Sequence, residues 1–189
     1  MDADVKLKIL LGVVLILLVG IYLSLGKTFF DSLSTTTIPQ TTTVPTTTST
    51  MAQITTFTDN GGAVETKNGK PVIRMFSTTW CPHCRWVKDA YETVAKEYVD
   101  RGEIIAYHWE FDIDDDTLRA EKIPVPDSEK KIFRRFNPGG GVPTFIFGSK
   151  YYRIGNGHER EKDLEAEKAE FRAVIEAVIN ESKQIAPDS

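Results

Sequence analysis

The chain has 189 residues, of which 41% are hydrophobic and 26% are charged, and its formal net charge is −4. This composition is typical of a globular protein, and the mild acidity argues against a broad phosphate-binding surface, so nucleic acid is not an expected partner. Two cysteines are too few for a disulfide-stapled scaffold or a four-cysteine zinc site. The composition changes abruptly twice along the chain, which predicts three segments.

The first segment is strongly apolar. Residues 9–26 carry no charge and consist mostly of Leu, Ile, Val and Gly; as a helix they would measure roughly 27 Å, close to the thickness of a bilayer core. Lys6 and Lys8 precede this run and Lys27 follows it, which favours a cytoplasmic N-terminus. We expect residues 1–31 to form a cytoplasmic stub and a transmembrane signal anchor in contact with lipid. A cleaved signal peptide is the alternative.

The second segment, residues 32–52, is rich in threonine and has no charged residue. Triplets of threonine recur with Pro39 and Pro45 between them, and such a stretch cannot bury enough apolar surface to offset its ordering entropy. The composition is typical of O-glycosylated extracellular stalks, and a plain flexible linker is the alternative. Both agree with a single-pass protein of the cell membrane whose C-terminal domain is extracytoplasmic.

Residues 53–189 are expected to form one α/β domain with a mixed central sheet flanked by helices. Residues 53–58 are a possible first strand, and residues 68–71 form a turn. The further expected elements are, in order, a strand at 72–77, a helix from Pro82 to a stop at Gly102, a strand at 103–111, a turn at 112–116, a helix capped by Asp127 or Ser128 and ending near Phe136, a hairpin of strands 144–148 and 151–155, and a helix whose apolar face includes Leu164, Phe171, Val174, Ile175, Val178 and Ile179.

Both cysteines lie in the sequence Cys81-Pro82-His83-Cys84, directly after a predicted strand and at the start of a predicted helix. Free backbone N–H groups and the helix dipole favour a thiolate on Cys81, whose side chain is expected to be the exposed one. With two residues between them, the sulfur of Cys84 can reach Cys81 and resolve a mixed disulfide with a substrate. His83 adds a donor, or a cation when protonated, that would stabilise the thiolate further.

With this motif the sequence resembles the thioredoxin superfamily over about residues 53–182. Trp80 before the first cysteine is a family feature, and the CPHC tetrapeptide is similar to that of DsbA-type disulfide oxidants. Gly141-Val142-Pro143-Thr144 resembles the family's cis-proline loop. The resemblance implies a thioredoxin-like fold, catalysis by Cys81 and Cys84, and a cis Val142–Pro143 bond next to Cys81, where Val142 would bind substrate peptide.

Two departures from the family pattern stand out. Thioredoxins carry a buried acid on the strand before the active site, and the matching position here is Met75. Glu110, Asp112 or water would then have to accept the proton of Cys84. Residues 113–140 also hold only a modest extra segment, whereas DsbA-type proteins carry a sizeable inserted helical domain.

Other polar groups have simpler explanations. A CxxC pair could be half a metal site, but it would need His108 or His158, and His108 is expected to be a satisfied structural histidine. The run Asp112–Asp116 lacks EF-hand spacing, so a solvated turn is expected rather than a calcium site. Asn180-Glu181-Ser182 is a glycosylation sequon expected to end a helix. No metal or other cofactor is expected.

The sequence therefore predicts a membrane-anchored thiol–disulfide oxidoreductase that forms or exchanges disulfides in secreted proteins. Its expected partners are thiol- or disulfide-containing proteins, with a membrane redox partner as a further possibility. Two alternatives remain open: an extracytoplasmic reductase in a membrane-linked electron pathway, and a tethered module that binds copper or another ligand without redox activity.

Overall fold

The structure is a computed structural model that describes residues 53–185. The expected cytoplasmic stub, transmembrane helix and stalk lie outside the described residues. Within residues 53–185, no helix combines the length and the apolar character needed to cross a membrane.

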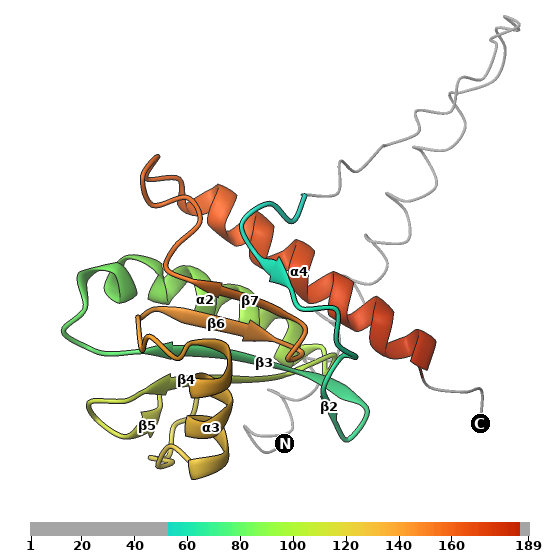
Figure 1. Ribbon diagram of the computed structural model, residues 1–189, viewed down its shortest axis with the longest axis horizontal. Coiled ribbons are helices and arrows are strands. Elements are labelled where there is room, and N and C mark those ends of the chain that lie inside the picture. Colours follow the sequence, from blue (N-terminus) through green and yellow to red (C-terminus); the bar gives the residue numbers. More distant parts are fainter. Residues whose placement is uncertain (1–52, 186–189) are drawn as a thin grey trace, which may run out of the picture. The chain divides into compact units, whose positions relative to one another are not determined.

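The described part is a mixed α/β domain (Figure 1). Its strands and helices follow the expected order, with two additional short strands. In chain order they are β1 (Thr58–Asp59), β2 (Thr66–Lys67), β3 (Lys70–Ser77), α2 (Pro82–Asp100), β4 (Ile105–Glu110), β5 (Asp115–Asp116), α3 (Asp127–Phe136), β6 (Thr144–Phe147), β7 (Tyr151–Ile154) and α4 (Leu164–Ile185).

The central sheet has the strand order β1-β7-β6-β3-β4-β5, and β2 pairs with the start of β3. β3 and β4 run parallel, as the intervening helix α2 predicts, because a parallel pair needs a long crossover connection. All the other pairs are antiparallel. The mixed sheet expected from the sequence is confirmed.

Alternate residues of the central strands face two separate apolar cores. On one face, Met75 of β3 and Phe145 of β6 pack in the core that contains most of the buried apolar residues of α2 and α4. On the other face, Phe76 and Ile146, their neighbours in sequence, pack with Phe133 of α3. Helices therefore cover both faces, with α2 and α4 on one side and α3 on the other (Figure 1).

The boundaries of α2 follow from local chemistry. Pro82 occupies the first helical turn, where its missing N–H costs no hydrogen bond. At the other end Gly102 has a φ of +73° directly after the cap residue Arg101, a conformation that glycine adopts without steric cost. The stop predicted at Gly102 is thus confirmed.

Several expectations about the strands need correction. The possible strand at 53–58 is reduced to Thr58–Asp59, because the backbone N–H groups of Thr55 and Thr56 donate to the Glu170 carboxylate instead of to a neighbouring strand. The turn at 68–71 is a hairpin turn between β2 and β3, with positive φ at Asn68 and Gly69, and β3 already begins at Lys70.

The acidic run is not a solvated turn throughout. Asp115 and Asp116 form β5, which pairs with β4, and Asp116 is fully buried. Its carboxylate accepts hydrogen bonds from the backbone N–H groups of His108 and Leu118, which compensate for part of the cost of burial.

The helices differ from expectation in three details. α3 is preceded by Pro126 without any side-chain cap, and Asp127 already lies in its first turn, so neither Asp127 nor Ser128 caps it. The sequon at Asn180 lies inside α4, which continues to Ile185, rather than at its end. Leu164 is 37% exposed because it is the first residue of α4, where the helix has not yet reached the core.

Candidate active site

Cys81 is the N-cap residue of α2. Its extended backbone (φ −72°, ψ 121°) turns the side chain back over the first helical turn, where the Cys84 N–H donates to Cys81 Sγ at 3.4 Å. Free N–H groups at a helix start stabilise negative charge. A thiolate at Cys81 is therefore placed where the helix favours it, and both cysteines are free thiols in this structure.

The loop before β6 covers Cys81 from the other side. The Val142–Pro143 peptide bond is cis, as predicted, and the Cys81 thiol donates to the Val142 carbonyl oxygen at 3.6 Å. Because the sulfur lies between this carbonyl and the helix start, only 4% of Cys81 is exposed. The expectation of an exposed Cys81 is wrong for this state of the protein, whereas the predicted proximity of Val142 and Pro143 is confirmed.

Cys84 lies one turn inside α2 and is 2% exposed. The pKa of the Cys84 thiol is raised to about 12, mainly by burial, with smaller contributions from the neighbouring Cys81 and the Glu110 carboxylate, although a backbone hydrogen bond from Thr78 acts in the opposite direction. Cys84 therefore stays protonated at neutral pH, and it needs a proton acceptor whenever it acts as a nucleophile.

A pocket of about 200 Å³ connects Cys84 with the buried carboxylate of Glu110. Lys88 lines the same pocket, and its Nζ lies 2.9 Å from Glu110 Oε1. Burial acts against the charge on Lys88, but the hydrogen bond and attraction of Glu110 outweigh it and raise the Lys88 pKa. Of the three proton acceptors expected from the sequence, Glu110 is thus a carboxyl group that lines the same pocket as Cys84.

Asp112 is less suited to that role. It is exposed, and its carboxylate accepts hydrogen bonds from the backbone N–H and the hydroxyl group of Thr79. These hydrogen bonds lower the Asp112 pKa, the hydroxyl of Thr79 contributing most.

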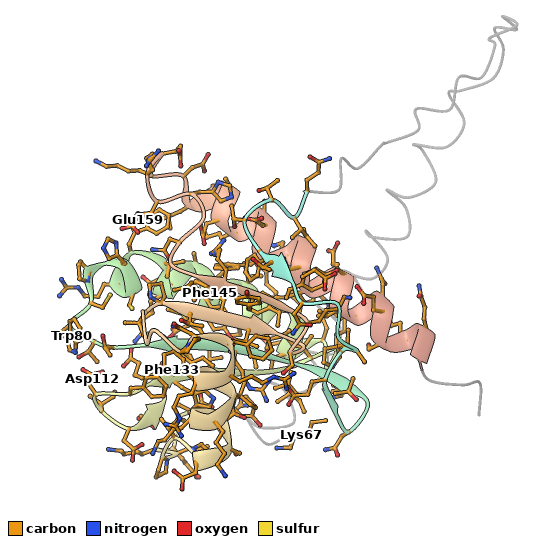
Figure 2. The ribbon with its side chains drawn as sticks, viewed as in Figure 1. Lys67, Trp80, Asp112, Phe133, Phe145 and Glu159 are labelled. Atoms are coloured by element: carbon orange, nitrogen blue, oxygen red, sulfur yellow. The ribbon has the colours of Figure 1, made fainter. Side chains whose placement is uncertain are left out.

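Trp80 is 66% exposed, and Figure 2 shows Trp80 and Asp112 at the same end of the domain. An apolar ring therefore lies open to solvent at the residue directly before Cys81.

His83 is exposed and contacts the loop between β7 and α4, residues 155–163, which we call the β7–α4 loop. Its Nδ1 lies 2.9 Å from both carboxylate oxygens of Glu159. From the same loop, the side-chain amide of Asn156 donates to the His83 carbonyl oxygen and to Glu159. These two loop residues were not predicted, because they lie more than 70 positions from His83 and no local sequence pattern marks them.

The other histidines have partners away from the cysteines. His108 is fully buried, with Ser77 Oγ at 2.7 Å from Nε2 and Glu92 at 2.7 Å from Nδ1, which confirms the expected structural role. His158 lies 3.1 Å from Glu170. Within residues 53–185, no three His, Cys, Asp or Glu side chains are grouped so as to hold a metal ion. Neither histidine therefore completes a metal site with the cysteine pair.

Comparison with known proteins agrees with this architecture. Residues 63–172, more than half of the chain, match the family model of the thioredoxin-like domain. A thioredoxin from Geodia cydonium is 28% identical over 94 residues, which cover 50% of this chain and 82% of that protein. No solved structure matches the chain significantly. The chain thus belongs to the thioredoxin-like domain family, whose members are generally oxidoreductases with redox or disulfide-related functions.

Proposed function

We propose that this protein is a membrane-anchored, extracytoplasmic thiol–disulfide oxidoreductase that forms or exchanges disulfides in secreted proteins. The observation that carries the proposal is the position of Cys81, which caps α2, receives the Cys84 N–H, and lies against the carbonyl group of Val142. This arrangement supports a nucleophile at Cys81 and a shielded second sulfur one helical turn away.

In the oxidising direction, a substrate thiolate attacks Cys81 Sγ of the Cys81–Cys84 disulfide. The S–S bond breaks, Cys84 leaves with the electron pair and takes up a proton, and a mixed disulfide joins the substrate to Cys81. A second substrate thiolate then attacks the substrate sulfur and releases Cys81 as a thiolate. The substrate has lost two electrons to form its disulfide, and the two cysteines have gained them. Glu110 and Lys88, next to Cys84, are placed to exchange the proton.

The side chains around the cysteines have supporting roles in this scheme. Pro82 and His83 occupy the first turn of α2, and Trp80 offers an exposed apolar surface to a substrate. The backbone of Val142 lies within reach of a peptide bonded to Cys81, so an extended substrate segment would pair with it by adding a strand. The recognition of protein thiols thus depends on main-chain contacts rather than on a deep side-chain pocket.

The membrane anchor and the orientation rest on the sequence alone: a charge-free span with a basic N-terminal flank, followed by a Thr/Pro-rich stretch. Protease added to intact cells is expected to release a soluble fragment that carries the CxxC motif. Complete protection in intact cells, with cleavage only after lysis, would contradict this orientation.

The activity is tested with the purified full-length chain in its disulfide form and a reduced, unfolded protein that needs disulfides to fold. We expect disulfides to appear in the substrate as Cys81 and Cys84 become reduced, and no reaction from Cys81→Ala. A substrate that stays reduced with the wild-type chain would overturn the proposal. The reduction potential identifies the direction: a value as low as that of thioredoxin, about −270 mV, would favour the reductase alternative.

A further inference from the structure

The contact between the active site and the β7–α4 loop suggests a role for that loop in redox chemistry. Glu159 is on this loop, at the same end of the domain as Trp80 (Figure 2). Both oxygens of its carboxylate lie 2.9 Å from Nδ1 of the His83 imidazole. The side-chain amide of Asn156 donates hydrogen bonds both to this carboxylate and to the His83 carbonyl oxygen. The middle of the CPHC motif is thus held by side chains from a distant part of the chain.

The β7–α4 loop is itself firmly anchored. The backbone N–H groups of Gly157 and His158 donate to one carboxylate oxygen of Glu167, at 3.0 and 2.8 Å. Glu167 is fully buried on α4, where it forms an ion pair with the buried Arg153 of β7. Since the backbone of the loop is hydrogen-bonded to a buried ion pair, the position of Glu159 is restrained, and Glu159 can orient His83.

We propose that Glu159 is a positioning residue of the active site, which holds the His83 imidazole on the β7–α4 loop and limits how strongly His83 stabilises the Cys81 thiolate. The inference rests on the proposed thiol–disulfide activity. An imidazolium that is paired with a carboxylate contributes less positive potential at the neighbouring sulfur than a free one. The contact of the His83 Nδ1 with both carboxylate oxygens also restrains the orientation of the imidazole ring.

The consequence concerns the balance between the dithiol and the disulfide. Reduction by glutathione converts the Cys81–Cys84 disulfide and two glutathione thiols into two protein thiols and one glutathione disulfide. The thiolate at Cys81 exists only in the reduced protein, so a group that stabilises the thiolate favours reduction and makes the protein more oxidising. Removal of the Glu159 charge should therefore shift the equilibrium toward the dithiol.

The test measures this equilibrium for the full-length chain in glutathione buffers, by alkylation of free thiols and mass spectrometry. Glu159→Gln is expected to raise the equilibrium constant for reduction about threefold to tenfold, because the charge of the His83 imidazolium is then no longer offset by a paired carboxylate. Glu161→Gln is the matched control, since Glu161 is an exposed carboxylate two residues further along the same loop. We expect it to change the constant by less than about twofold.

A double-mutant cycle shows whether Glu159 acts through His83. In a His83→Gln background, Glu159→Gln is expected to lose most of its effect. Asn156→Ala, which removes the amide group that supports both residues, is a second variant and should shift the equilibrium in the same direction as Glu159→Gln.

Two outcomes would overturn the inference while leaving the proposed function intact. One is that the wild-type protein equilibrates with glutathione, and the equilibrium constants of Glu159→Gln and Asn156→Ala both lie within twofold of the wild-type value. The other is an equal effect of Glu159→Gln with and without His83. A wild-type protein that does not exchange with glutathione at all would instead overturn the proposed function.

Discussion

Glu110 and Cys84 line one pocket, although they come from different elements, the end of β4 and the first turns of α2. In thioredoxins the buried acid belongs to the strand before the active site, and Met75 occupies that position here. The carboxylate that shares a pocket with Cys84 is thus supplied by the neighbouring parallel strand, with Lys88 at 2.9 Å as its counter-ion.

If Glu110 accepts the proton of Cys84, Glu110→Gln should slow the resolution of a mixed disulfide about 100-fold or more, since general-base catalysis contributes roughly 10²- to 10⁴-fold. The lifetime of the mixed disulfide can be followed by acid quench and gel electrophoresis. Asp112→Asn is the matched control and is expected to leave the lifetime within about twofold. Equal lifetimes in wild type and Glu110→Gln would point to water as the acceptor.

The two cysteines should have different roles in trapping experiments. Cys84→Ala is expected to accumulate mixed disulfides with protein substrates, because Cys81 can attack but nothing resolves the product. Cys81→Ala should trap few, since Cys84 is buried and has a pKa of about 12. Non-reducing electrophoresis of alkylated extracts measures the complexes. The opposite pattern would reverse the assignment of nucleophile and resolving cysteine.

His83 should make the protein a stronger oxidant. His83→Pro removes the imidazole at a position in the first turn of α2 where proline is tolerated, and it should weaken the stabilisation of the thiolate. We expect the reduction potential to fall by roughly 30–60 mV, which corresponds to a tenfold to hundredfold change in the redox equilibrium. An unchanged potential would show that the helix start alone determines the redox balance.

The other face of the sheet contains a charge network that matters for stability. Arg74 is 2% exposed and binds Glu129 at 2.6 Å and Glu65 at 2.7 Å. Glu129→Ala leaves this buried guanidinium with only one of its two carboxylates, so we expect a loss of about 3–5 kcal/mol in the free energy of unfolding. Asp127→Ala, at an exposed site on the same helix, should cost less than about 1 kcal/mol. Urea unfolding of both variants makes the comparison, and equal losses would contradict the role of the network.

Glu170 predicts a dependence of stability on acidic pH. Burial alone would raise its pKa, but hydrogen bonds from Thr56 and Thr55 and the charge of Arg153 outweigh burial and lower it. A carboxylate with a lower pKa in the folded state stabilises the fold at pH values above its unfolded pKa. This contribution is lost as the pH falls through the folded pKa, because the unfolded chain binds the proton first.

The unfolding midpoint in urea should therefore fall between pH 6 and pH 3. Glu170→Gln should be less stable than wild type at pH 6, and its midpoint should decrease less over the same range. Parallel curves for the two proteins would contradict a special contribution of Glu170.

The parts of the fold that the sequence predicted are those with local signals. The helix start at Cys81 is marked by Pro82, and its end by Gly102. The hairpin of β6 and β7 is marked by Gly148 and Ser149, which both have positive φ. Such features depend on a few adjacent residues, so an isolated sequence is sufficient to locate them.

Of the two missing parts, one is too short to give a sequence pattern and the other joins residues that are far apart in sequence. β5 has only two residues and forms because Asp116 accepts N–H groups from the neighbouring segments. The contact of His83 with Glu159 spans 76 positions. A strand of two residues is too short to show an alternating pattern, and the contact of His83 with Glu159 exists only because the assembled domain brings the two segments together.

The near-complete burial of Cys81 has a consequence for the choice of substrates. With 4% of the residue exposed, a cysteine on a rigid protein surface cannot approach the sulfur without a clash with the surrounding chain. A thiol in a flexible, extended segment can be threaded past Val142 to the sulfur. In the proposed reaction this geometry selects substrates by conformation rather than by side-chain identity, and a client protein would escape further oxidation as soon as it has folded.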